Sequence, residues 1–307
     1  MNDRSSRWII EEDVEDKGPS TPEWFEKAIA DAPSSHHLSV EGCDIHYLRW
    51  GPAAAEKPGI LFVHGGAAHA QWWSFIAPFF AADRPVAAID LSGCGDSGRR
   101  EEYTSTQRVV EMAAVIEDAG LGAKPVVVGH SFGGYMTMCF GHHHGADLSG
   151  VVIVDSALRP PSDEDEGPSG GPGRPKPYFP NKDTIVRRYR LSPWQPCENE
   201  YLVQHIAQHA VVEEAQGWTW KYDDNARGRG RRDEPLANYL RDMACPKALF
   251  YGTESVLMTE EALAYTKEQF KTTDPFVAVP AAGHHLTLDQ PLAFVVGLRS
   301  ILAGWDA

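Results

Sequence analysis

The sequence predicts an α/β fold, with a mostly parallel central sheet flanked by helices and an inserted helical cap. Short, nearly continuous runs of Val, Ile, Leu and Phe recur along the 307-residue chain and alternate with helical segments, as is typical of parallel strands buried on both faces. This alternation stops between about 156 and 241 and then resumes. A Gly-x-Ser-x-Gly motif stands where one strand run passes into a helix, a third sign of this architecture.

The predicted elements follow in chain order. Buried strands are expected within 59–66, 85–93, 124–131, 150–157, 247–253 and 275–283. Helices are expected over 104–119, 131–144, 260–271 and 290–303. We assign 36–155 and 242–307 to the sheet domain.

Residues 1–35 form an acidic N-terminal arm that precedes the sheet domain. Within it, 21–33 predicts a short helix with Thr21 as N-cap and Pro22 at the first helical position. After it, 36–50 predicts two strands joined at a Glu41–Gly42 turn.

Residues 156–241 predict a cap, or lid, inserted into the sheet domain, because they are too many for a simple crossover. The insertion begins with a loop rich in Pro, Gly and acidic residues at 159–177 and continues with helical pieces rich in aromatic residues. Trp194 and Trp218 are two of these aromatic residues, and we expect them to contact a substrate.

Composition narrows the possible partners. The net charge of −15 and pI of about 5.3 make binding to nucleic acid or to an anionic membrane surface unfavourable. The five cysteines are scattered without a CxxC pair, and no segment reaches 18 consecutive apolar residues. We therefore expect a cytoplasmic protein with free thiols and a small-molecule partner. The pattern predicts no particular oligomeric state.

The segment 126–135 is the strongest functional signal. Gly129-His130-Ser131-Phe132-Gly133 follows a buried strand and opens a helix. That context is typical of a nucleophile elbow, in which a sharp turn raises the serine hydroxyl above the sheet at a helix N-terminus. We therefore predict Ser131 as the nucleophile.

A second segment, 61–73, places His-Gly-Gly directly after a buried strand. Acyl transfer requires two N–H donors for the oxyanion, and we assign them to Gly66 and to Phe132, the residue after the nucleophile. Trp72 and Trp73 follow this loop, and we expect them to line a substrate pocket.

The base is expected late in the chain, where a Gly-His pair follows the last strand run. Gly283 is followed by two histidines, His284 and His285, and we favour His284 because it comes directly after the glycine. No metal site is expected: the run His142–His144 lies at a helix end, and consecutive histidines cannot all converge on one ion.

The order of the segments 64–66, 90–98, 129–134 and 283–291 resembles the α/β-hydrolase superfamily, in its cap-bearing branch of esterases, lactonases, dehalogenases and carbon–carbon hydrolases. The resemblance covers nearly the whole chain outside the arm and cap. It implies that the histidine of GHxxxxE/DxP is catalytic, and counting back from Asp289 gives His284. It also implies serine-dependent hydrolysis rather than dehalogenation, because the dehalogenase branch has aspartate where this chain has Ser131. No cofactor is implied.

The acid that should orient the histidine is displaced from its usual place. Most family members have an aspartate in the loop after the strand at 247–251, but that register gives Ser255 here. Two carboxylates remain: Asp155 at the end of the preceding strand and Glu254 in the same loop. We favour Asp155, because it sits at a fixed strand end where catalytic groups gather, and retain Glu254 as the fallback.

These features predict a serine hydrolase that cleaves a small-to-medium carboxylic ester or lactone through an acyl-enzyme on Ser131. A carbon–carbon hydrolase acting on a diketone would use the same triad, although it usually needs cationic groups for an acidic substrate. A relative that binds a ligand without turnover is the third alternative, kept open by the displaced acid.

Overall fold

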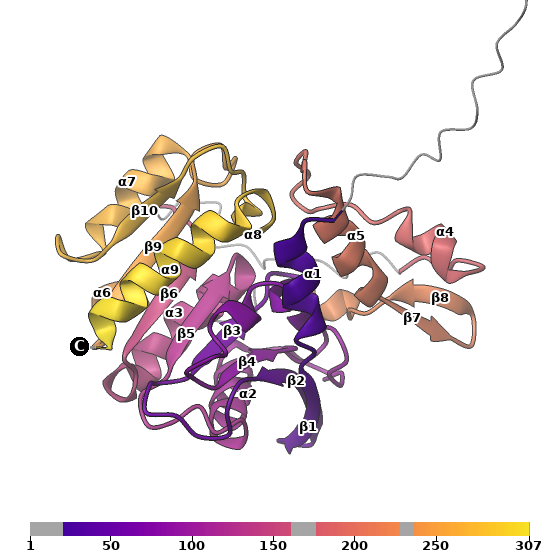
Figure 1. The fold of residues 1–307 in the computed structure, drawn as a ribbon, viewed down its shortest axis with the longest axis horizontal. Helices are drawn as coiled ribbons and strands as arrows, with labels where there is room; N and C mark the ends of the chain where they lie inside the picture. The colour runs from indigo at the N-terminus through magenta and orange to yellow at the C-terminus, as the bar shows by residue number, and fades with distance from the viewer. Residues whose placement is uncertain (1–20, 161–175, 228–235, 307) are drawn as a thin grey trace, which may run out of the picture.

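A computed structural model describes residues 21–160, 176–227 and 236–306. Within these ranges, eight strands form one sheet in the order β1-β2-β4-β3-β5-β6-β9-β10 (Figure 1). Only the pairs that involve β2 are antiparallel, so the predicted mostly parallel sheet is confirmed. The strands are β1 (Ser34–Val40), β2 (Cys43–Trp50), β3 (Ile60–Val63), β4 (Val86–Ile89), β5 (Val126–His130), β6 (Gly150–Val154), β9 (Lys247–Gly252) and β10 (Phe276–Val279).

Helices cover both faces of the sheet (Figure 1). One face packs against the 3-10 turns η1 (Ala70–Trp73) and η2 (Ala77–Phe79) and the helices α1 (Glu23–Ala30), α8 (Leu286–Asp289) and α9 (Pro291–Trp305). The other face packs against α2 (Ser105–Asp118), α3 (Phe132–His144), α6 (Leu236–Arg241) and α7 (Glu260–Glu268). A further 3-10 turn, η3 (Gly145–Asp147), follows α3.

The buried strands explain the apolar runs in the sequence. In β3, Ile60 and Phe62 face one core while Leu61 and Val63 face the other. All four side chains are fully buried. A strand sandwiched between two helical layers has no polar face, so its residues are apolar without alternation.

The first helix begins slightly later than predicted. Pro22 is in an extended conformation and is the N-cap, and α1 starts at Glu23. The Thr21 hydroxyl donates a hydrogen bond to the Glu26 carboxylate and does not cap a backbone N–H. The prediction of Thr21 as N-cap is therefore wrong, although the helix itself is present.

Two antiparallel hairpins occur among the described residues, and the sequence predicts only one of them. The β1–β2 turn is at Glu41 and Gly42, both with positive φ, as expected. The second hairpin joins β7 (Val211–Glu214) to β8 (Gly217–Trp220), where the sequence predicts helical pieces. Phe179 and Trp218 exchange backbone hydrogen bonds at 2.8 and 2.9 Å, so distant pairing helps to hold this hairpin.

The chain between β6 and β9, which we call the inserted segment, contains α4 (Lys182–Val186), α5 (Glu200–His209), the β7–β8 hairpin, η5 (Asp224–Arg227) and α6. Most of the predicted 159–177 loop lies outside the described residues. A Cβ placed on Gly141 of α3 would lie 2.7 Å from the Met243 side chain, so the chain after α6 is again packed on the sheet domain. The cap limits at 156 and 241 stay a prediction.

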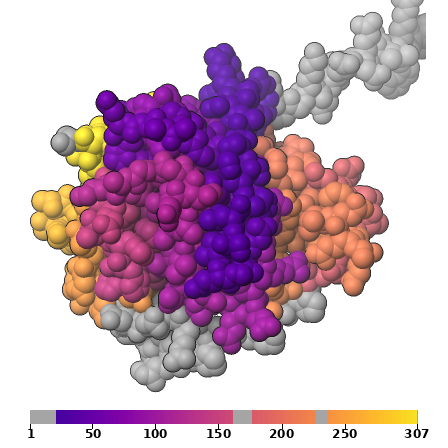
Figure 2. Space-filling model, turned by 90° about the horizontal axis from the view of Figure 1, so that it is seen from below, coloured from indigo at the N-terminus to yellow at the C-terminus, as the bar shows by residue number. Residues whose placement is uncertain are grey.

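The helix α1 packs against both the sheet domain and the inserted segment. Phe25 of α1 is 5.0 Å from the Tyr201 ring and 5.6 Å from the His205 ring, both on α5. It also packs against Phe75 of the sheet domain at 6.4 Å. Figure 2 shows the N-terminal part of the described chain as an indigo strip beside the orange inserted segment. Residues 1–20 of the predicted acidic arm lie outside the described residues.

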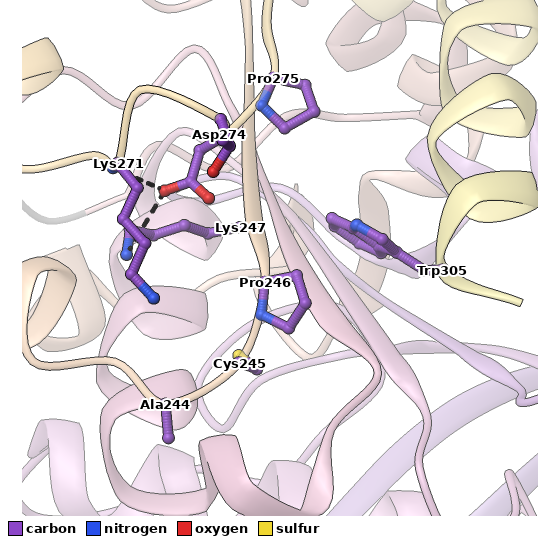
Figure 3. A pocket seen from close by; sticks show the side chains of 9 residues that line it. Ala244, Cys245, Pro246, Lys247, Lys271, Asp274, Pro275 and Trp305 are labelled. Carbon is purple, nitrogen blue, oxygen red and sulfur yellow. Dashed lines mark hydrogen bonds and ion pairs between the residues drawn. The ribbon is translucent and has the colours of Figure 1, made fainter. Parts of the chain in front are cut away.

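A hollow of about 310 Å³ opens at the N-terminal ends of β9 and β10. Lys247 and Lys271 reach it, and both contact Asp274 (Figure 3); the Lys247 ammonium lies 3.6 Å from the carboxylate. Lys247 begins β9, whereas Gly252 ends it beside the residues described below. This hollow is therefore at the opposite end of the sheet from the candidate site.

None of the helices in the described ranges is both long enough and apolar enough to cross a membrane.

Two buried histidines and one partly buried histidine make stability depend on pH. Burial lowers the pKa of His69 and His285 to about 3 and that of His205 to about 4, from an ordinary value of 6.5. Their stabilisation is present above that ordinary value and is lost as the pH falls, because the unfolded chain then takes up protons that the folded protein refuses. We predict that the free energy of unfolding, measured in urea, decreases below about pH 6.5, by up to about 1.4 kcal/mol per pH unit for each histidine.

The variant His205→Gln tests this prediction, because glutamine removes the titrating ring but can still hydrogen-bond to the Ser74 hydroxyl, which lies 2.8 Å from the His205 ring. Between pH 6.5 and 4.5 this variant should lower the pH dependence of the free energy of unfolding by up to about 1.4 kcal/mol per pH unit, the contribution of one histidine. An unchanged slope would contradict the assignment of His205.

Candidate active site

Ser131 stands on a strained turn between β5 and α3. Its φ of 54° and ψ of −117° are sparsely populated for a residue with a side chain. A Cβ on Gly129 would lie 2.2 Å from the Gly133 carbonyl oxygen, and one on Gly133 would lie 2.4 Å from that of Val63. The turn therefore requires both glycines of the motif, and it places the serine hydroxyl above the end of the sheet.

Ser131, His284 and Asp155 meet in one hydrogen-bonded line. The His284 Nε2 lies 2.9 Å from the Ser131 Oγ, and its Nδ1 lies 2.7 Å from the Asp155 Oδ1. A carboxylate can only accept, so Nδ1 carries the proton and Nε2 accepts from the serine hydroxyl. His284 is 2% exposed and Asp155 is 1% exposed. The three residues follow β5, β10 and β6, whose C-terminal ends meet at one edge of the sheet.

The Asp155 carboxylate is held by two further donors. Gly252 donates its N–H to Oδ2 at 2.8 Å, and Ser255 donates its hydroxyl to Oδ1 at 2.6 Å. Ser255, at the usual register of the acid, thus supports an acid that comes from another strand. Glu254 is exposed, and its N–H is used by the Ala282 carbonyl. The structure therefore brings Asp155, and not Glu254, to the histidine.

The loop that carries His284 is fastened by residues that sequence reasoning did not select. Asp289 accepts the Gly283 N–H and the Gln195 amide through Oδ2, both at 2.7 Å. Gln195 in turn accepts the His285 N–H at 2.9 Å. Burial raises the pKa of Asp289. Because Gln195 belongs to the inserted segment, that segment binds the backbone after His284 directly and the backbone before it through Asp289.

His130 supports the same loop from the other side. Its Nε2 donates to the His284 carbonyl oxygen at 2.9 Å. Burial is the main cause that holds the pKa of His130 well below its ordinary value. The position of His130 inside the Gly-x-Ser-x-Gly motif was the only sequence signal for this contact.

The two predicted oxyanion donors lie side by side. A Cβ placed on Gly66 would lie 3.6 Å from the Phe132 Cβ. Phe132 begins α3, so its N–H is one of the free donors at a helix N-terminus. Within the described parts of the chain, neither N–H donates a backbone hydrogen bond elsewhere. Both are thus available to a ligand oxygen beside Ser131.

The predicted substrate-contacting tryptophans occupy different environments. Trp72 lies 5.4 Å from the His285 ring and 6.2 Å from that of His130, next to the site. Trp73 is 2% exposed and stacks on Phe62 at 4.6 Å, so we reassign it to the core. Trp194 and Trp218 belong to the inserted segment.

These last two tryptophans differ in exposure. Trp194 is 72% exposed and directly precedes Gln195, which contacts the histidine loop. Trp218 pairs with Phe179 and lies beneath the Lys182 ammonium at 6.0 Å. Neither Phe179 nor Lys182 belongs to the hydrogen-bonded line, so the role of Trp218 as a substrate contact stays a prediction.

Two groups of side chains, considering only the described residues, have potential metal-ligand atoms within 4.8 Å of one another: His130, His284 and His285, and a second set of His46, Asp90 and Asp96. In both groups, ring nitrogens already form hydrogen bonds inside the protein, as His46 does with Asp90 at 2.7 Å. The expectation that no metal takes part stays a prediction.

Comparison with known proteins finds a matching family model and curated relatives. A sequence model of the Alpha/beta hydrolase family matches residues 60–298. The chain is 25% identical over 289 residues to Esterase Rv0045c of Mycobacterium tuberculosis, covering 90% of this chain and 92% of that protein. It is 33% identical over 115 residues to Lipase LipV of the same organism, covering 38% of this chain and 42% of LipV. The LipV match thus spans less than half of that protein.

Solved structures show the same fold. A thioesterase domain from the curacin biosynthetic pathway matches with a TM-score of 0.72 at 22% identity, covering 89% of this chain and 99% of that domain. The structure of Rv0045c matches with a TM-score of 0.69 at 22% identity, covering 93% of this chain and 100% of that one.

The choice between the two carboxylates can be checked without any assay of turnover. The His284 Nδ1–H proton, hydrogen-bonded to a buried carboxylate, should give a downfield proton NMR resonance. We predict that Asp155→Asn abolishes this resonance or moves it upfield, because the charged acceptor is lost. Glu254→Gln, the matched control, should leave it in place. The reverse pattern would show that Glu254 is the partner in solution.

Proposed function

The chain belongs to the α/β-hydrolase family, and on this premise we propose that it is a serine hydrolase of small-to-medium carboxylic esters or lactones. The observation that carries the proposal is the line of hydrogen bonds from Ser131 through His284 to Asp155, at 2.9 and 2.7 Å. Relatives named as an esterase and a lipase support ester chemistry.

The first step forms an acyl-enzyme. The Ser131 Oγ attacks the substrate carbonyl carbon while His284 Nε2 takes the hydroxyl proton. The Asp155 carboxylate holds the Nδ1–H, so the ring keeps the tautomer with a free Nε2 and its positive charge is stabilised. The N–H groups of Gly66 and Phe132 donate to the carbonyl oxygen as it becomes an oxyanion. The protonated His284 then gives its proton to the leaving alcohol.

The second step releases the acid. Water attacks the acyl carbonyl carbon and His284 Nε2 takes a proton from it, so that a new C–O bond forms as the bond to Ser131 Oγ breaks. The same two N–H donors stabilise the second oxyanion. Ser131 recovers its proton from His284, and the carboxylic acid product leaves. The chemistry is complete with the side chains and water, so we propose that no cofactor takes part.

The carbon–carbon hydrolase and the non-catalytic binding protein remain the alternatives. The first shares this triad and predicts turnover of a diketone in place of an ester. The second predicts a Ser131 that does not react. The connected hydrogen bonds of His284 favour a reactive serine, because a buried aspartate, a histidine and a serine in line are what activates the hydroxyl.

We predict that a fluorophosphonate probe labels Ser131 and that Ser131→Ala abolishes labelling. In a p-nitrophenyl ester assay, Asp155→Asn should lower kcat roughly 10⁴-fold, the loss expected when the orienting carboxylate of such a triad is removed. Glu254→Gln, as the control, should stay near the wild-type rate. Absence of labelling in a folded protein would favour the binding protein.

A second prediction uses the position of Ser255. Its Oγ contacts the same Asp155 oxygen that contacts His284, so a carboxylate at 255 can reach the ring. Adding Ser255→Asp to Asp155→Asn should raise kcat about 10-fold or more above that of Asp155→Asn alone. Ser255→Asn in the same background has similar size without charge and should give no rescue. Equal rates for the two double variants would show that charge at 255 does not reach His284.

A further inference from the structure

Arg108 is a buried cation without an anionic partner. It lies in the first turn of α2 and is 1% exposed. Its Nη2 donates to the Ala226 carbonyl oxygen at 3.1 Å, whereas Nε and Nη1 have no hydrogen-bond partner. Across the described ranges it forms no ion pair. Buried guanidinium N–H groups are normally satisfied, so two unpaired nitrogens require an explanation.

None of the described groups around Arg108 gives it an anionic hydrogen-bond acceptor, although the nearby Glu111 charge acts to raise the pKa of Arg108. Glu111 is already used, since its Oε1 accepts from Arg100 at 2.9 Å and its Oε2 accepts the Ser92 N–H at 3.0 Å. Burial raises the pKa of Cys94 to about 12, so that thiol is neutral. Burial also lowers the pKa of Arg108 itself, which reflects the cost of holding its charge there.

Aromatic rings lie against the faces of the guanidinium, whereas two nitrogens at its buried edge have no acceptor. Its Cζ lies 4.7 Å from the centroid of the Phe132 ring and 5.4 Å from that of Tyr103. Such contacts stabilise a cation through its faces, and the N–H groups point outward in its plane. An anion with oxygen acceptors would complete this edge.

The location connects Arg108 to the reactive serine. Phe132 directly follows Ser131, is partly exposed and carries one of the two proposed oxyanion N–H donors. The cation is therefore one side chain away from the nucleophile. Ala226 belongs to η5 of the inserted segment. Because the two nitrogens are buried, a ligand reaches them only if the surrounding residues move.

We propose that Arg108 binds a carboxylate of the substrate, so that this hydrolase acts on esters that carry a negative charge. The inference rests on the proposed function and narrows its substrate class. Arginine suits this task because its N–H groups match carboxylate geometry. A chain with a net charge of −15 repels anions at long range, and only a local cation of this kind can select them.

The test compares charged and neutral esters of the same shape. If the carboxylate is in the acyl part, mono-p-nitrophenyl adipate should be preferred over methyl p-nitrophenyl adipate. If it is in the leaving group, 4-acetoxybenzoate should be preferred over methyl 4-acetoxybenzoate. We expect Arg108→Gln to lower kcat/KM for the charged ester of one pair about 10- to 100-fold. The neutral esters should change by less than about 3-fold, and Arg108→Lys should be intermediate.

Arg84→Gln is the matched control, because Arg84 is also buried but pairs with Asp306 at 2.5 Å. It should not change the preference for charged esters. Equal losses of Arg108→Gln on charged and neutral esters would overturn the proposal, because they would show a role in the fold or in oxyanion stabilisation. No loss on any charged ester would also overturn it.

Calorimetry with monomethyl adipate separates this inference from the proposed function. Binding to the wild type that is lost in Arg108→Gln would support the carboxylate site even if no ester were cleaved. Absence of binding to a folded wild type that also shows no preference for charged esters would overturn the site while leaving the serine hydrolase intact.

Discussion

The hydrogen bond between the Asp155 carboxylate and His284 is the interaction on which the site depends. It joins the end of β6 to the loop after β10, and the same carboxylate also receives Gly252 and Ser255 from the end of β9 and its following loop. A buried carboxylate is costly unless its oxygens are hydrogen-bonded. Here these three donors, one of which takes part in the proposed chemistry, satisfy it. Ser255 therefore stands where most family members have the acid, but here it donates a hydrogen bond to the acid, Asp155.

The inserted segment forms direct contacts with the loop that carries His284. Gln195 contacts Asp289 and His285, both of which follow His284 in its loop, and Asn199 donates to the Leu288 carbonyl oxygen at 2.7 Å. The helix α5 packs on Phe25 of α1 through Tyr201 and His205. A substrate that displaced the segment would therefore also shift the loop of His284, because the Gln195 contacts are short. In this arrangement substrate recognition and orientation of the base are physically linked.

Charge is distributed unevenly between the surface and the site. The protein is strongly acidic, yet a guanidinium without an ion pair lies beside Phe132 among the described residues. Keeping such a group reduces stability, and features of this kind are commonly retained where function requires them. A carbon–carbon hydrolase would also need a cation near its acidic substrate, so Arg108 is relevant to that alternative as well as to ester hydrolysis. The hydrogen bonds of Ser131, His284 and Asp155 would serve either reaction.

The sequence by itself determined the parallel sheet, its helical layers and the positions of Ser131 and His284 in the turns that carry them. These features depend on local pattern: apolar runs buried on both faces, and glycines where a turn excludes a Cβ. It could also narrow the acid to two residues, but not choose between them with certainty, because the choice depends on which strand ends meet in space. The β7–β8 hairpin, the Gln195–Asp289 contacts, the reassignment of Trp73 to the core and the unpaired nitrogens of Arg108 were decided only by tertiary structure. Each of them joins or isolates groups distant in the chain, and a linear pattern does not record such distances.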